Sequence, residues 1–217
     1  MRSPGKRGKK PGAPAARPPG SQTIAAETLD RMTPDELAAV LLILLTRHPD
    51  LRGEAESVAV ELVSAPSPED TAEDVFARVT ALGIDALRHR AGRQPWGYVE
   101  PTEAVCEILE ESVVDLFADI KRRLELGLET AAEAICRGIV IGLHRARKRG
   151  SDGLLGWVVD FPEETACRAV GELLRACPPA VRDAVRDRIV AALAVDVPDW
   201  SEMIARAADR AVAEMHT

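Results

Sequence analysis

The chain has 217 residues, of which 46% are hydrophobic but only 3% aromatic, so it can bury one substantial core of aliphatic side chains. Its abundance of alanine, leucine and charged residues is typical of helical proteins. The longest apolar run, Leu37–Leu45, is shorter than the ~18–20 residues that cross a bilayer, and the basic, proline-rich N-terminus lacks the apolar region of a secretory signal. We therefore expect neither a membrane-spanning helix nor a secretory signal.

Charge is divided unevenly along the chain. Residues 1–22 carry a formal charge of +6 with no acidic residue, and the total of −7 leaves −13 for the remainder. This Pro/Gly-rich segment cannot bury enough apolar surface to fold, so we expect a disordered tail. The tail either makes weak, nonspecific nucleic-acid contacts or is a solubilising extension. Its candidate contact residues are Lys6, Arg7, Lys9 and Lys10. Residues 23–217 are expected to form a single helical domain.

The first predicted helix follows a strong start signal. Thr33–Glu36 combines a capping threonine, a proline at the first helical position and a glutamate that completes a capping box. We expect this helix to end near Arg47, because His48-Pro49-Asp50 interrupts the pattern. A second helix over Leu51–Ser64 then forms a helical hairpin with a very short turn.

A third helix is expected from Pro68, capped by Ser67, to about Arg90, with a bend at Gly83. Cations at its end suit the negative pole of the helix dipole, although they could instead hold an anion. These cations are Arg88, Arg90 and Arg93, together with His89.

The loop Gly92–Pro101 contains two aromatic residues, Trp96 and Tyr98. Aromatic side chains are enriched at protein interfaces, so both residues are candidates for a partner-binding surface. They could equally fill a gap between pairs of helices. We favour the second alternative.

A long fourth helix is expected over Thr102–Leu126, with Gly127 ending it. Glu110 and Glu111 could suggest acid/base chemistry. Adjacent residues on a helix diverge by about 100°, so we assign this pair to a solvated acidic face instead of a shared site.

The central helix, Leu128–Arg149, has the clearest burial pattern. One apolar stripe recurs at steps of three and four residues, and Ala134, Gly138 and Gly142 form a second line. Glycine inside a helix costs roughly 1 kcal/mol relative to alanine, so two glycines on one line predict that another helix packs there at close range. The basic end, Arg145–Arg149, suits the helix dipole.

The C-terminal third continues the helical pattern after a turn at Gly150–Gly153. A short apolar segment is followed by three helices, and no strand is expected anywhere in the chain. Their expected positions are Leu154–Val159 for the segment, then Pro162–Ala176, a helix opened by Pro178-Pro179, and Asp199–Glu214. About eight helices joined by short turns predict an all-α fold of antiparallel hairpins, arranged as a bundle or a short α-solenoid.

The order of features around the central helix resembles a known helical region. A long helix ends at Leu124–Gly127, Glu129–Ala132 open the next, and its basic end precedes Ser151-Asp152-Gly153 and Gly156. This order is similar to the helical-repeat region found beside SWIM zinc fingers in bacterial proteins, and in related uncharacterised helical proteins. The resemblance implies an α-solenoid-like scaffold. The finger's closely spaced cysteines do not occur here, so its nucleic-acid role is not implied.

Motifs for catalysis or metal binding are not found in the sequence. Structural zinc needs ligands at short spacing, whereas the nearest cysteines, Cys167 and Cys177, are ten residues apart. Nucleophilic catalysis needs a base beside a serine or cysteine, and the four histidines are scattered. We therefore expect no metal, no cofactor and no enzymatic activity. Cys106 and Cys136 are expected to be reduced, packed thiols, as are the other two cysteines.

The sequence favours a non-enzymatic helical-repeat scaffold that mediates protein–protein contacts in the cytoplasm. The identity of the protein partner and the oligomeric state are not predicted. The alternative is a nucleic-acid-associated accessory protein that uses the basic N-terminal tail. Binding through that tail would be weak, and no membrane association is expected.

Overall fold

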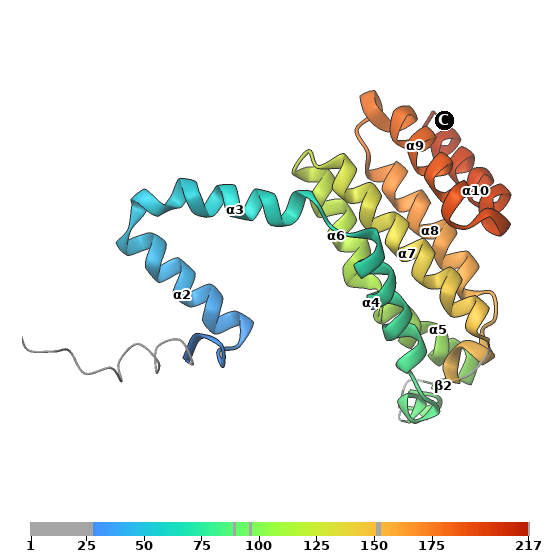
Figure 1. Cartoon of the computed structure of the whole chain (residues 1–217). Coiled ribbons are helices and arrows are strands. Elements are labelled where there is room, and N and C mark those ends of the chain that lie inside the picture. The colour runs from blue at the N-terminus through green and yellow to red at the C-terminus, as the bar shows by residue number, and fades with distance from the viewer. Residues whose placement is uncertain (1–27, 89, 96, 151–152, 217) are drawn as a thin grey trace, which may run out of the picture. The chain divides into compact units, whose positions relative to one another are not determined.

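The computed structural model describes residues 28–88, 90–95, 97–150 and 153–216 (Figure 1). The chain divides into two units, Met1–Glu56 and Ser57–Thr217. Helices dominate the described residues of both, so the predicted all-α class is confirmed. Among these residues, no helix is both long and apolar enough to cross a membrane.

In the first unit, the helix Pro34–Arg47 begins with the predicted capping box. The Thr33 hydroxyl accepts a hydrogen bond from the Glu36 amide at 3.3 Å, and the Thr33 amide donates to a Glu36 carboxylate oxygen at 2.8 Å. The second predicted helix starts one residue late because Leu51 belongs to a 3₁₀ turn. The elements are α2 (Pro34–Arg47), η1 (Pro49–Leu51) and α3 (Arg52–Ser64), the last of which continues into the second unit.

The second unit continues with α4 (Pro68–Ala81), which begins as predicted. The Ser67 hydroxyl accepts a hydrogen bond from the Asp70 amide at 3.1 Å. The predicted continuation of this helix to Arg90 is wrong. Leu82 and Gly83 adopt extended backbone conformations that end the helix, and a separate 3₁₀ turn, η2 (Ile84–Leu87), follows.

A short antiparallel strand pair, β1 (Gly92–Gln94) and β2 (Gly97–Val99), corrects the expectation that no strand occurs. Gly92 and Gly97 have φ angles of 90° and 151°, which residues with a side chain rarely adopt. Glycine at these positions therefore lets the chain reverse direction. Arg93 and Tyr98 lie opposite each other across the pair.

The predicted long fourth helix is divided in two, α5 (Pro101–Glu111) and α6 (Val114–Glu125). The Ser112 hydroxyl donates to the Leu109 carbonyl at 2.6 Å, a local bond of the kind that competes with helical pairing. Val113 leaves the helical conformation, with ψ near zero (−4°), and its side chain is fully buried. The break therefore brings an additional apolar side chain into the core.

Helix α7 (Glu129–Arg149) is the centre of the second unit, and α4, α6, α8 and α9 pack against it (Figure 1). The predicted close contact at the glycine line is confirmed. A Cβ atom built on Gly138 would lie 2.7 Å from the Pro68 carbonyl oxygen, and one built on Gly142 would lie 2.6 Å from that of Ala72. The residues of the predicted stripe that lie within α7 are buried: Ala132, Ile135, Ile139 and Leu143.

The C-terminal helices agree with the predicted order and differ at their boundaries. The last helix starts at Ser201, later than predicted, because Pro198–Trp200 form a 3₁₀ turn. The elements are η3 (Gly153–Trp157), α8 (Phe161–Ala176), α9 (Pro179–Asp196), η4 (Pro198–Trp200), α10 (Ser201–Ala213) and η5 (Glu214–His216). Their apolar faces join one core around α7 that includes Leu173, Leu174, Ile189, Leu193 and Ile204.

Candidate functional site

Of the residues proposed from sequence as contact sites, the structure describes Tyr98. It lies on β2 with 65% of its surface exposed, so the interpretation that it fills a gap between helices is wrong. Its proposed role in binding a partner stays a prediction. Trp96 and the four tail residues lie outside the described part of the chain: Lys6, Arg7, Lys9 and Lys10.

The most unusual surface of the described chain is on α2, none of whose residues is buried. Five large apolar side chains on this helix are between 42% and 67% exposed. We call them the α2 apolar surface, and they are Leu37, Leu41, Leu42, Ile43 and Leu44. Soluble proteins rarely leave a contiguous apolar patch of this kind in water unless it serves as a binding surface.

The residues of α2 are apolar around the whole helix. At about 100° per residue, Leu37, Leu41 and Leu44 fall on one stripe, whereas Leu42 and Ile43 point away from it. A helix that is hydrophobic on all sides is normally buried. The sequence signal was present in the uninterrupted run Leu37–Leu45, which departs from the pattern of a helix with one solvent-facing side.

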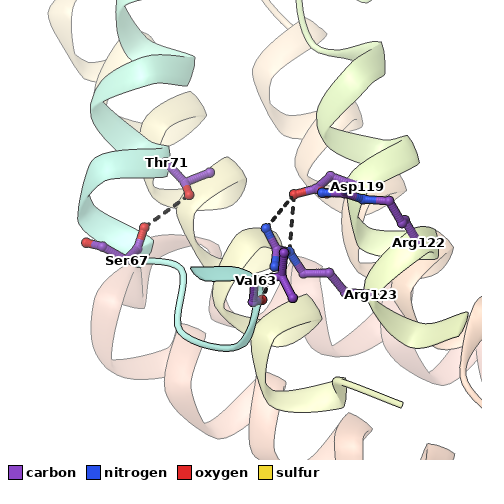
Figure 2. A network of polar contacts seen from close by, with 6 residues as sticks. All are labelled: Val63, Ser67, Thr71, Asp119, Arg122 and Arg123. Carbon is purple, nitrogen blue, oxygen red and sulfur yellow. Dashed lines mark hydrogen bonds and ion pairs between the residues drawn. The ribbon is translucent and has the colours of Figure 1, made fainter. Parts of the chain in front are cut away.

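A buried arginine, Arg123, bonds the C-terminal end of α3 (Figure 2). The Arg123 side chain, 9% exposed, donates from Nη1 to the Val63 carbonyl oxygen. Its Nε and Nη2 donate to Asp119 at 3.2 and 3.1 Å. A cation on the last carbonyls of a helix satisfies groups that have no partner within the helix. The C-terminal end of α3 is therefore fixed to α6, a role that sequence analysis did not assign to Arg123.

A groove of about 410 Å³ is bordered by α5, α6 and α8. The Phe117 ring lies in its lining, with the Arg168 guanidinium 4.8 Å from the ring centroid. Arg168 also donates to Glu110 at 2.8 Å, whereas Glu111 pairs with Arg90. The two adjacent glutamates thus have different partners, which supports the prediction that they do not form an acid/base pair.

The basic run at the end of α7 is compensated by neighbouring groups. Arg145 forms a bidentate pair with Glu69, at 2.6 and 2.8 Å. Arg147 lies 3.5 Å from a Glu163 oxygen and Lys148 lies 3.7 Å from an Asp199 oxygen, while Arg149 stacks on Phe76. These contacts leave little uncompensated positive charge, so the run is not a built anion site.

A polar cluster fastens η4 to α7. The buried His144 has its Nε2 2.8 Å from an Asp199 carboxylate oxygen, and its ring meets the edge of Trp200 at a centroid distance of 4.9 Å. No nucleophilic side chain is hydrogen-bonded to His144 in the described residues, since its hydrogen bond goes to Asp199. The geometry is that of a structural contact.

The four cysteines are free thiols. Burial raises the pKa of each, that of Cys177 to about 11, so the reactive thiolate is disfavoured at neutral pH. No group of three or more His, Cys, Asp or Glu side chains suited to a metal ion occurs within the described ranges.

No family model, curated protein or solved structure matches the chain. The resemblance to the helical region beside SWIM zinc fingers therefore stays a prediction.

Proposed function

We propose that the chain is a non-enzymatic helical scaffold that binds protein through the α2 apolar surface. One observation carries this proposal: α2 is apolar on all sides and has no buried residue. The four free thiols favour a reducing, cytoplasmic location as part of the proposal. The SWIM-associated resemblance agrees with a scaffold role.

The free energy available at this surface supports binding. Fully burying a leucine or isoleucine contributes about 1.5–3 kcal/mol, so covering five side chains that are about half exposed contributes on the order of 5 kcal/mol. Association costs roughly 4–15 kcal/mol. Leu29 and Leu51, which are 49% and 40% exposed in the same unit, would add to the contact. Burial of α2 and these two leucines therefore offsets the low end of this cost, and apolar surface that the partner buries at the same contact adds to this stabilisation.

The second unit has the properties of a preformed support. Its core is continuous around α7, and within the described residues no buried side-chain nitrogen or oxygen lacks a hydrogen-bond partner. Buried polar groups that are fully paired make a fold rigid and specific. Such a body keeps its own fold when the first unit binds a partner.

The proposal is tested by affinity capture from the native host with two variants. Leu41→Glu combined with Leu42→Glu places charge on the α2 apolar surface, and we expect it to abolish capture of specific partners. Val195→Glu is the matched control, because Val195 is an 81% exposed apolar residue on α9. Circular dichroism establishes that both variants remain helical. An identical set of captured proteins for all three chains would refute the proposal.

Nucleic-acid association through the tail is a second candidate. It is favoured by the charge of +6 on residues 1–22 and by the ion pairs that compensate the basic run Arg145–Arg149. The remainder of the chain, at −13, repels a phosphate backbone. Any such binding is therefore assigned to the tail.

A further inference from the structure

We infer that the α2 apolar surface binds α2 of a second copy of this chain, antiparallel, in a symmetric dimer. This inference rests on the proposed function and names its partner. It follows from three properties of the helix, which are the positions of its charges, the direction of its dipole and the distribution of its apolar residues.

The charges of α2 lie only at its two ends. Asp35 and Glu36 are in the first turn, and Arg47 is in the last. Asp35 and Arg47 are about 18 Å apart at a rise of ~1.5 Å per residue. In an antiparallel pair, Arg47 of each copy lies opposite the acidic turn of the other, whereas a parallel pair brings like charges together. Neither Asp35 nor Arg47 forms an ion pair with the residues that the structure describes.

Antiparallel pairing also suits the helix dipoles, because the positive N-terminal end of one α2 meets the negative C-terminal end of the other. A twofold contact uses the same surface on both copies, so each α2 covers one apolar side of the other. A different protein would need an apolar surface flanked by charges in the reverse order. A second α2 already has both features.

The length of α2 disfavours a position across a membrane, and its charges disfavour a position on an anionic membrane surface. Its 14 residues span about 21 Å, less than the ~30 Å hydrocarbon core of a bilayer. Its flanking charge is also unsuited to an anionic membrane surface, since the two acidic residues of the first turn outnumber the one basic residue of the last.

The first experiment measures the mass of the full chain in solution by light scattering over a range of concentrations. We expect a dimer for the native chain and for Val195→Glu. For the Leu41→Glu and Leu42→Glu double variant, we expect the dissociation constant to rise about tenfold or more. A dimer that persists unchanged in the double variant overturns the inference.

A hydrophobic dye separates failure of this inference from failure of the proposed function. If the native chain is monomeric and binds dye through α2, so that the double variant loses the signal, the self-pairing is overturned while the binding surface stands. If the native chain is monomeric and the double variant does not change dye binding, α2 is covered within its own chain. Both proposals then fail.

Charge reversal tests the antiparallel orientation. Asp35→Arg alone and Arg47→Asp alone should each weaken the dimer, by about twofold to tenfold. Combining both substitutions in one chain should restore affinity, because antiparallel pairing then again opposes unlike charges at both ends, whereas parallel pairing still brings like charges together. Circular dichroism checks that each variant retains α2. A chain with both substitutions that pairs no more tightly than either single variant overturns the antiparallel arrangement.

Discussion

The carbonyl oxygen of Ala72 lies 2.6 Å from the place where a Cβ atom on Gly142 would stand. This distance is shorter than a real Cβ contact, so even alanine forces the backbones of α4 and α7 apart. We expect Gly142→Ala to destabilise the protein by about 1–3 kcal/mol, although alanine favours a helix by ~1 kcal/mol. Urea denaturation provides the measurement.

Gly53 is the matched control for this substitution. It lies in α3, and a Cβ atom there would meet nothing within 4 Å. Gly53→Ala should therefore leave stability unchanged or raise it by up to ~1 kcal/mol. If both substitutions change the free energy of unfolding equally, the close contact between α4 and α7 does not limit which residues stability tolerates at position 142.

Arg123 and Arg122 are neighbours on α6 that bond the same carboxylate, Asp119, but differ in burial and in their contact with Val63. Arg123→Met removes the cation on the end of α3 and leaves the Val63 carbonyl without that partner. We expect a loss of about 1–3 kcal/mol. Arg122 is 59% exposed, so Arg122→Met should change stability by no more than about 0.5 kcal/mol. Equal midpoints for the two variants in a denaturant series would contradict this assignment.

Close packing was predictable because it depends on local spacing. Gly138 and Gly142 recur on one face of a helix, and only a neighbouring backbone explains their selection over alanine.

The break between α5 and α6 was not predictable from periodicity. Ser112 is compatible with a helix, and burial of Val113 is a tertiary effect that overrides local propensity. Arg123 was missed for the same reason, since Val63, which it contacts, is 60 residues away.

For the α2 apolar surface, the sequence predicted the helix but not the exposure of its side chains. The Thr33 cap and the apolar run predicted the helix correctly. Whether those side chains meet a core or face solvent depends on the position of α2 relative to other apolar groups. The sequence pattern carries no such information, so the exposure of Leu42 and its neighbours emerged only from the structure.

Acid is expected to destabilise the fold through its ion-paired carboxylates. Hydrogen bonds from Arg145, Arg90 and Lys121 hold the pKa values of Glu69, Glu111 and Glu172, respectively, below the ordinary range. Because the pKa of each of these carboxyl groups is lower in the folded chain, the unfolded chain binds more protons at the same acidic pH. The stabilisation is therefore complete above the unfolded glutamate pKa of about 4.3 and is lost as the pH falls through the folded values.

Unfolding free energies measured at pH 7 and below pH 4 test this expectation. Glu172→Gln should reduce the difference between the two pH values, because the pKa shift of this carboxyl is removed. Glu125→Gln is a control, since Glu125 is exposed and forms no ion pair among the residues described. An equal reduction in both variants would show that the Lys121 contact does not set the acid sensitivity.

The basic tail should account for any binding to nucleic acid. Residues 1–22 offer six cations, and each phosphate contact contributes a slope of about −0.9 in log affinity against log salt on duplex DNA. Full engagement would give a slope near −5. Arg145, Arg147 and Lys148, which could compete as a binding site, are already paired with carboxylates.

We expect the full chain to bind duplex DNA without sequence preference, with a dissociation constant of roughly 10⁻⁴–10⁻⁶ M at physiological salt. A shortened chain beginning at Ser21 should lose this binding, because the remaining chain is strongly acidic. Titration of both chains against the same duplex at several salt concentrations gives the affinity and the slope. Tight, sequence-selective binding by the shortened chain would require a nucleic-acid site on the helical body and would contradict the protein-binding function proposed for it.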